Sequence, residues 1–307
     1  MGKHGRRKDD VHGILLLDKP FGITSNTALQ EAKLLLAARK AGHTGSLDPI
    51  ATGLLPLCFG EATKISSFLL NADKRYWTRF KLGVATATGD ADGDVIKTNR
   101  VDVDTERLEQ ALARFCGSFD QVPPMFSAVK HRGQPLYKFA RKGINIDRKP
   151  RRVSVHSIKL NDRSDENIDV EIHCSSGFYV RSLAHDLGDY LGCGAHVAAL
   201  RRTGVGCFAL DDAVTLEALR RAEGPDACRR FLMPGDRGLS HIPEVCLSVD
   251  AAFYLCRGQP VRAADAPGSG WVRLYSKAAG FLGVGTVLED GRVAPKRLFH
   301  ARESGCD

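Results

Sequence analysis

The sequence predicts a mixed α/β protein with two unequal domains, and three observations support this. The chain has 307 residues, which is more than one compact domain usually holds. Strand-like and helix-like segments alternate along residues 11–245, whereas short strand-like runs dominate residues 246–307. The composition, 43% hydrophobic and 26% charged, is globular, and no apolar run approaches the length of a membrane span. We therefore expect a soluble protein.

The N-terminal segment, residues 1–10, is basic and polar and contains no apolar signal-peptide core. It predicts a disordered tail and a cytoplasmic location. The net charge of the chain is +8 at pH 7. This excess favours a polyanionic partner, because lysine and arginine attract phosphates and release counterions.

The first regular elements precede a segment rich in glycine and proline. Residues 13–17 are an apolar run short enough for a buried strand, and Asp18-Lys19-Pro20 predicts a turn after it. Residues 26–38 have apolar side chains at helical spacing and predict an amphipathic helix. This helix leads into residues 41–64, AGHTGSLDPIATGLLPLCFGEATK.

Residues 41–64, here called the signature segment, contain four glycines and two prolines, which predict specified turns rather than a regular element. Asp48 lies in it between Leu47 and Pro49. A carboxylate held by a rigid loop against apolar neighbours can act as a nucleophile or as an acid or base. The alternative is that Asp48 caps a short helix whose first residue is Pro49.

The next segments alternate between helix and strand. Residues 62–70 predict a helix, and residues 74–82 alternate polar and apolar side chains as a half-buried strand does. Tyr76 shares the apolar face of this strand, so it either lines an interior pocket or is a core tyrosine. Residues 86–94 are rich in glycine and aspartate but lack the twelfth-position glutamate of an EF-hand, so no calcium loop is expected there.

Basic residues gather in the middle of the chain. Residues 106–115 and 135–142 predict helices, the second closed by Gly143. A basic run follows, which is expected either to contact phosphates or to form a solvated face: Arg141, Lys142, Arg148, Lys149, Arg151 and Arg152.

The remaining predicted elements include a helix that carries Arg181, a second charged candidate for the functional site beside Asp48. Residues 153–160 and 167–174 predict two strands, and Arg181 follows at the start of a helix. Short helices are expected at residues 215–222 and 227–232. The last part predicts a helix near residues 249–256 and then three strands, with Asp290-Gly291 as a hairpin turn: 271–275, 281–288 and 292–299.

The cysteines and histidines argue against a disulfide framework and a metal. The nine cysteines are scattered with no CxxC pair, and the ten histidines show no HExxH or similar ligand spacing. We therefore expect no metal.

Several motifs closely resemble the bacterial tRNA pseudouridine-55 synthases, the TruB family. The signature segment resembles the catalytic loop of that family over more than twenty consecutive positions, and the overall resemblance extends over residues 13–299. Phe178 departs from the family, which usually has threonine there. Four shorter segments also resemble family motifs: LLLDKPFGITS (15–25), DKRYW (73–77), QVPPMFSAVKHRGQPLY (121–137) and CSSGFYVRSL (174–183).

The resemblance implies a fold of two domains. A pseudouridine-synthase catalytic domain, residues 11–245, would be built around a largely antiparallel mixed sheet, with residues 121–152 as an insertion that clamps RNA. Residues 246–307 would be a small β-rich PUA domain that touches the acceptor end of tRNA.

The resemblance also implies roles for particular residues. Asp48 would be the catalytic residue, Tyr76 would stack on the target base, and Leu200 would pack against that base. Arg181 is the expected ion-pair partner of Asp48, because an opposite charge lowers the pKa of a carboxylate and keeps it ionised. Tyr179 would form a wall of the pocket.

Four further residues are expected to bind the RNA. His43, beside the catalytic loop, would fill or hold open the space that the base leaves, with a satisfied core histidine as the alternative. Lys19 would contact RNA or brace the catalytic loop, unless it is a surface lysine in a turn. Lys130 and Arg132 would contact phosphates, with an exposed loop as the alternative.

The implied reaction is the isomerisation of uridine to pseudouridine in the T-arm of tRNA, with the base flipped out of its stack. Nothing is oxidised and no group leaves, so no cofactor is expected. A single carboxylate can attack C1′ of the ribose, attack C6 of the base, or remove a ribose proton to give a glycal, and the sequence leaves these routes open.

Two other functions remain as alternatives. One is a guide-RNA-dependent synthase acting on ribosomal RNA, and the other is an RNA chaperone that refolds tRNA. The chain has no long basic tails and ends in a compact PUA-like unit, which favours an enzyme acting on tRNA without guide RNA or protein partner. Nothing in the sequence demands more than a monomer, and without a long apolar run no membrane contact is expected.

Overall fold

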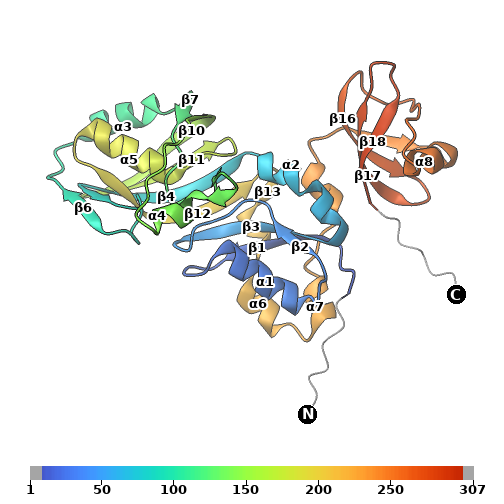
Figure 1. Cartoon of the computed structure of the whole chain (residues 1–307), viewed down its shortest axis with the longest axis horizontal. Coiled ribbons are helices and arrows are strands. Elements are labelled where there is room, and N and C mark those ends of the chain that lie inside the picture. Colours follow the sequence, from blue (N-terminus) through green and yellow to red (C-terminus); the bar gives the residue numbers. More distant parts are fainter. Residues whose placement is uncertain (1–8, 300–307) are drawn as a thin grey trace, which may run out of the picture.

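The computed structural model describes residues 9–299 as two units, each with its own sheet (Figure 1). A ten-stranded sheet forms the centre of the larger unit, and a four-stranded sheet forms the C-terminal unit. Among these described residues, no helix combines the length and apolar character that crossing a bilayer requires.

The central sheet is mixed and mostly antiparallel. Only the β1–β14 and β3–β12 pairs are parallel within this sheet as described, so the antiparallel arrangement that the sequence implied is confirmed. Strand β2 (Ala41–His43) pairs with β3, and β13 (Phe208–Ala209) pairs with β12. The main path runs in the order β14 (Val214–Thr215), β1 (Gly13–Lys19), β3 (Ala51–Phe59), β12 (Ala195–Val205), β4 (Lys74–Leu82), β11 (Asn167–Cys174), β10 (Arg151–Ser164) and β7 (Gly117–Gln121).

Helices cover the two halves of this sheet separately (Figure 1). Helices α3 (Thr105–Arg114) and α5 (Val180–Leu191) pack over the half that contains β4, β10, β11 and β12. Helices α1 (Ser25–Leu35) and α6 (Leu216–Arg221) pack near β1 and β3, with α7 (Pro225–Arg229) beside them. The apolar side chains of the larger unit are therefore buried in three main clusters, two of which cover the opposite faces of β1 and β3.

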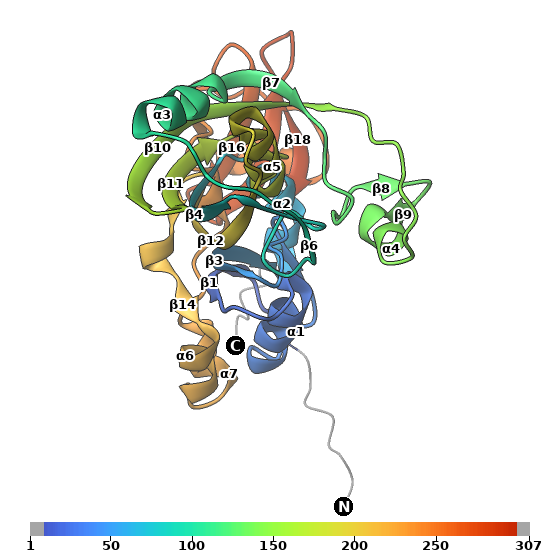
Figure 2. The same ribbon diagram turned by 90° about the vertical axis from the view of Figure 1, so that its left-hand side faces the viewer.

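Two smaller pairs of strands leave the central sheet. Strands β5 (Val84–Thr86) and β6 (Val95–Thr98) flank the acidic turn. Strands β8 (Lys130–His131) and β9 (Gln134–Pro135), followed by α4 (Leu136–Ala140), project away from the sheet (Figure 2).

The C-terminal unit contains helix α8 (Val249–Cys256) and a sheet in the order β15 (Glu244–Leu247), β16 (Gly270–Ser276), β17 (Gly280–Val287) and β18 (Val293–Leu298). It contacts the larger unit at 3-10 helices η1 (Gly60–Ile65) and η3 (Gly235–Leu239). Lys64 Nζ donates to Leu298 O at 2.7 Å, and Phe68 meets Trp271 edge to face at 5.0 Å between ring centroids. The C-terminal sheet begins at Glu244, two residues before the boundary expected from the sequence.

Several local expectations were wrong. The signature segment is not all loop, because β2 and β3 take up much of it. Pro49 begins no helix, so Asp48 is not a helix cap. The apolar run of the signature segment forms β3, a central strand, because apolar side chains cover both of its faces. The predicted 62–70 helix is split between η1 and α2 (Ser66–Asn71), which meet at Ile65.

Residues 1–8 and 300–307 lie outside the described residues, and with them most of the predicted N-terminal tail. Asp9 is ordered as part of the fold, since its N–H donates to Ala37 O at 2.8 Å and its carboxylate pairs with Arg229.

Two further short elements connect β1 with the chain that follows β13. They are the 3-10 helix η2 (Leu210–Asp212) and the bridge between Ile14 and Met233.

Candidate active site

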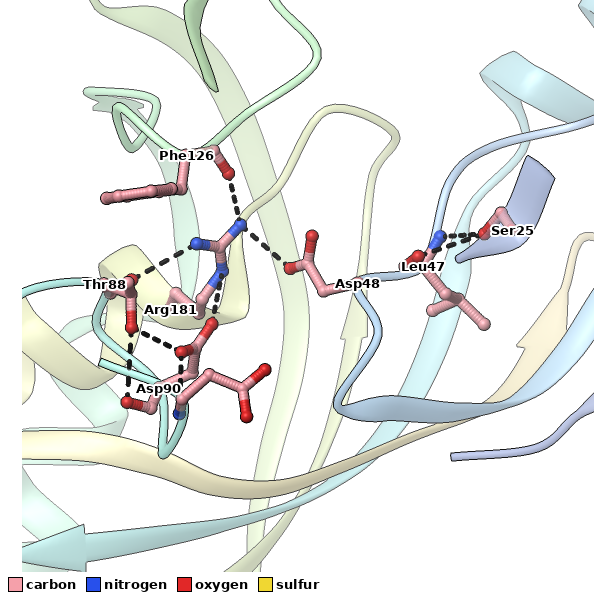
Figure 3. Close-up of polar contacts among 8 residues, drawn as sticks. Ser25, Leu47, Asp48, Thr88, Asp90, Phe126 and Arg181 are labelled. Carbon is pink, nitrogen blue, oxygen red and sulfur yellow. Dashed lines mark hydrogen bonds and ion pairs between the residues drawn. The ribbon is translucent and has the colours of Figure 1, made fainter. Parts of the chain in front are cut away.

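Asp48 lies on the turn between β2 and β3, held from both sides (Figure 3). The buried Ser25 hydroxyl donates to Leu47 O at 3.0 Å and accepts from Leu47 N at 2.7 Å. On the other side, Ala51 N donates to Asp48 O at 3.0 Å. Because these bonds fix the backbone at Leu47 and Asp48, the carboxylate starts from a defined position.

Arg181 faces Asp48 from the first turn of α5 (Figure 3). The distance from Arg181 Nη2 to Asp48 Oδ2 is 2.8 Å, and the arginine side chain is only 6% exposed. The guanidinium also donates to Phe126 O at 2.7 Å and to Thr88 O at 3.2 Å. These carbonyls aim the charge at Asp48, and the alternative of an exposed arginine in a first helical turn does not apply.

A second carboxylate, Asp90, lies behind the same arginine. The distance from Asp90 Oδ2 to Arg181 Nε is 3.6 Å. The other oxygen of Asp90 accepts from the Thr88 hydroxyl and, at 3.2 Å, from Asp92 N (Figure 3). Asp90 therefore supports Arg181 from the acidic turn, so that one buried cation lies between two carboxylates.

The pKa of Asp48 is raised above its ordinary value. Burial is the largest cause, the positive charge of Arg181 opposes it, and Asp90 adds to the rise. The sequence led us to expect a lowered pKa from Arg181 alone. That contribution is present, but burial outweighs it; because 41% of the Asp48 side chain remains exposed, water moderates the rise.

Arg202, on β12, is a site residue that sequence reasoning missed. It is 1% exposed, and its guanidinium donates to Leu54 O at 2.7 Å and Gly45 O at 3.1 Å. It also binds the Tyr76 hydroxyl, whose pKa is raised by burial. One buried cation thus joins the signature segment to the tyrosine on β4. An arginine two positions after Leu200 in an apolar strand was the available signal.

Lys19 is fully buried at the end of β1, so it is not a surface lysine. Its Nζ donates to Pro20 O and Ile23 O, both at 2.8 Å, and to Pro49 O at 3.5 Å. Burial lowers the pKa of Lys19 to about 8, against the opposing effect of Asp48. These contacts match the brace interpretation, because Pro49 directly follows Asp48.

The remaining pocket candidates lie around this centre. Leu200, on β12, pairs with Ala51 on β3 and with Thr78 on β4, and it is 9% exposed. Tyr179 directly precedes α5, and its backbone is fixed by two hydrogen bonds with the side chain of Gln121. Burial raises the pKa of the Tyr179 hydroxyl. Phe178, the departure from the family motif, is buried in the core.

The surroundings of His43, on β2, favour the neutral form of its ring. Burial is the larger cause of its lowered pKa, and the positive charge of Arg202 is the smaller one. Its Nδ1 is buried and has no hydrogen-bond partner among residues 9–299. It is thus not a satisfied core histidine. Lys130 and Arg132 are exposed on the projecting hairpin, and no contact in the described chain joins them to Asp48 (Figure 2).

The class of the protein follows from comparison of the chain with known families. Residues 33–180, which carry Asp48 and Tyr76, match the model of the TruB family pseudouridylate synthase N-terminal domain. Residues 181–240 match the tRNA pseudouridylate synthase B C-terminal domain, and residues 243–299 match the model for pseudouridine synthase II TruB, C-terminal. The protein is therefore a pseudouridylate synthase, an isomerase.

Whole-chain relatives agree with this class. A tRNA pseudouridine synthase B of Nitrosococcus oceani is 53% identical over 95% of this chain and 96% of its own length. One of Pseudomonas aeruginosa is 52% identical over 98% of this chain and 100% of its own. The chain belongs to the TruB family.

The fold is also shared with a solved structure of lower sequence similarity. The crystal structure of a Cbf5-Nop10-Gar1 complex contains a chain that superposes with a TM-score of 0.73 at 25% identity. The match covers 95% of this chain and 86% of that one. The likeness therefore includes both units of the molecule.

Proposed function

We propose that this enzyme converts uridine 55 in the T-arm of tRNA to pseudouridine, with Asp48 as its catalytic residue. The observation that carries the proposal is the ion pair of Asp48 with Arg181 at 2.8 Å, on the turn before β3. Relatives named tRNA pseudouridine synthase B, 52–53% identical over nearly the whole chain, support tRNA as the substrate.

The reaction requires no oxidant and no external group. The N1–C1′ bond breaks, the uracil rotates, and a C5–C1′ bond forms while C5 loses a proton and N1 gains one. An ionised carboxylate can serve by attack at C1′, by attack at C6, or by removing a ribose proton. Asp48 carries this role, and Arg181 keeps it charged and aimed in spite of its burial.

The pocket residues hold the flipped base in this scheme. Tyr76 stacks on the uracil, with its hydroxyl held by Arg202. Leu200 packs against the base, and Tyr179 forms the wall beside Arg181. His43 occupies the space that the base leaves, with the neutral ring that its surroundings favour.

The surface charge supports RNA binding outside the pocket. The net charge is +8, and the exposed Lys130 and Arg132 lie on the hairpin that projects from the sheet. Residues 121–152 would clamp the arm of the tRNA, and the C-terminal unit, as a PUA domain, would reach the acceptor end. Such contacts act through phosphates and are sensitive to salt. An enzyme with this substrate works in the cytoplasm.

The test is release of tritium from a T-arm stem-loop labelled at C5 of uridine. The wild type is expected to release tritium without guide RNA or other proteins. Asp48→Asn is expected to release none while retaining affinity for the RNA. An equal loss of binding and rate would make Asp48 structural, and no release by the wild type from stem-loop or full tRNA would favour a guide-dependent enzyme.

A chaperone activity on tRNA would be separate from this chemistry. Asp48→Asn protein that still accelerates tRNA folding would reveal it, since the variant retains the RNA-binding surface.

A further inference from the structure

Three side chains that could bind a metal ion lie together outside the active site. Asp73 is on the link between α2 and β4, His156 is on β10, and His173 is on β11. Each offers one ligand atom, a carboxylate oxygen or an imidazole nitrogen, and in the part of the chain that the structure describes these three atoms lie within 4.8 Å of one another. They are far apart in the sequence, which explains why ligand spacing gave no sign of them.

The cluster lies on the face of the sheet opposite the base pocket. On β11, Ile172 and Cys174 are buried in the core, so His173 between them points to the other face. Tyr76 is paired with Ile172 across β4 and β11 and therefore shares the core face. Metal binding at His173 would thus not place an ion beside Asp48.

A β-bulge turns His156 toward His173. Val155 pairs with Cys174, whereas the next registered pair is Ser157 with His173, so His156 is an extra residue in β10. In such a bulge the two residues of the longer strand lie opposite one residue of its partner. Because His156 and His173 now share a face, their rings lie 4.6 Å apart.

The donor atoms are close to the spacing of a metal site. Asp73 Oδ2 lies 3.0 Å from His156 Nε2 and 3.9 Å from His173 Nε2. Ligands about 2.0–2.2 Å from a tetrahedral ion lie about 3.4 Å from one another, so small side-chain rotations would suffice. The three side chains are 42–47% exposed, which leaves room for water as a further ligand.

The surrounding charges permit a cation at this place. The neighbouring Lys74 donates to Leu70 O at 2.6 Å and to Ala72 O at 2.5 Å. Arg75, opposite His173 on β4, directs its guanidinium to Phe208 O at 3.4 Å. Both cations are thus turned toward carbonyl groups. The backbone of Asp73 is fixed by another contact, because Gly206 N donates to the Asp73 carbonyl at 2.8 Å.

We propose that Asp73, His156 and His173 bind one divalent transition-metal ion. Two imidazoles and one carboxylate suit zinc and its neighbours, whereas magnesium and calcium prefer oxygen ligands. The ion joins the β10–β11 hairpin to the link before β4, and so it stabilises the sheet rather than taking part in isomerisation.

The experiment uses untagged full-length protein treated with chelator, then titrated with zinc chloride by calorimetry and followed by thermal melting. The wild type binds one zinc ion and melts at a higher temperature with zinc. The double variant His156→Ala/His173→Ala binds zinc at least about tenfold more weakly and loses the thermal shift. Since this variant keeps every cysteine, thiol binding cancels in the comparison.

Two more variants make the result decisive. Asp73→Asn keeps the shape of the side chain and is expected to weaken zinc binding as well. His241→Ala, an exposed histidine outside the cluster, is expected to bind as the wild type does. Equal zinc affinity of the double variant and the wild type would overturn the proposal, as would a wild type whose melting temperature zinc does not raise.

Discussion

At Asp48, burial and ion pairing change the pKa in opposite directions. Burial raises it, Arg181 lowers it, and the net effect is a rise. A carboxylate with these neighbours is easier to protonate than a free one, yet it has a cation 2.8 Å away that is itself held by two carbonyls. Arg181 thus offsets part of the free-energy cost of burying the charged form of Asp48.

The Asp48–Arg181 pair leads to a prediction on pH. If ionised Asp48 is the active form, activity falls as the pH drops through its pKa, which lies above the ordinary value of 3.8. Arg181→Met removes the charge that lowers this pKa and is expected to raise it further. The check is a carboxyl-carbon NMR titration, with Asp48→Asn to assign the signal. Arg79→Met, which removes an ion pair with Asp169, should leave it unchanged; an unchanged or lower value in Arg181→Met contradicts the prediction.

Arg202 leads to a second prediction at this scale. Arg202→Lys keeps the charge but cannot reach Tyr76, Gly45 O and Leu54 O together, since a lysine has one compact donor group. We expect kcat to fall by about tenfold to a hundredfold, with little change in KM, because the Tyr76 ring, which we propose stacks on the base, is less well positioned.

The matched control for this change is Arg201→Lys. Arg201 is the neighbour on β12, is 37% exposed and pairs with Asp18. We expect near-normal kcat from it. Equal losses in the two variants would mean that Arg202 has no special role in positioning Tyr76.

At the scale of elements, the parallel contact between β3 and β12 brings the signature segment next to Arg202. Gly53 on β3 is paired with Arg202 on β12, and Leu200 is paired with Ala51. Antiparallel neighbours on each side complete the sheet, so residues about 150 positions apart in the sequence become adjacent. The proposed base pocket depends on how closely these two strands approach.

Gly53→Ala tests this approach. Gly53 has φ +100°, and a Cβ there would lie 2.3 Å from Arg202 O. We expect a loss of stability of at least about 2 kcal/mol, from the unfavourable backbone conformation and the clash, and a loss of activity with it. Urea unfolding measures the first effect and tritium release the second.

Gly42→Ala provides the comparison within the same segment. A Cβ at Gly42 would have no heavy atom within 4 Å, so little change is expected. Gly53→Ala protein as stable as Gly42→Ala protein would show that β3 and β12 can separate without harm.

At the scale of the whole molecule, the two units are joined by a hydrogen bond and an apolar cluster. Lys64, at the end of the signature segment, binds β18 through Leu298 O. Beside it, Ile65, Leu239, Ile242 and Val284 form an apolar cluster between the units. An apolar contact of this kind restricts the relative motion of domains more than a polar one does.

The projecting hairpin leads to a prediction on salt. Lys130→Ala and Arg132→Ala should each weaken tRNA binding and reduce the slope of log K against log salt by about 0.7–0.9 if each contacts one phosphate. Filter binding at several salt concentrations measures this. Arg221→Ala, on α6 and away from the hairpin in Figure 2, should leave the slope unchanged. Unchanged slopes for both hairpin variants would place the phosphate contacts elsewhere.

Local patterns were sufficient for much of the fold and for the centre of the site. The alternation in residues 74–82 predicted β4 at its observed bounds, and the apolar spacing before residue 115 predicted α3. Strands β7 and β12 were not predicted, and β12 is central to the sheet. The alternation of polar and apolar residues along β12 is interrupted by Arg201 and Arg202. Arg202 is nevertheless buried, because its hydrogen-bond partners come from segments that are distant in the sequence.

The sequence by itself determined the segment that carries Asp48, the directions of side chains along β4 and the approximate division into two units. Only the tertiary structure decided that Arg202 and Lys19 are buried, that burial outweighs Arg181 at Asp48, and that Asp73 meets His156 and His173. The physical reason is that periodicity and turn residues are local properties of the chain. Burial, ion pairing and ligand geometry depend on strands that are distant in sequence and adjacent in space.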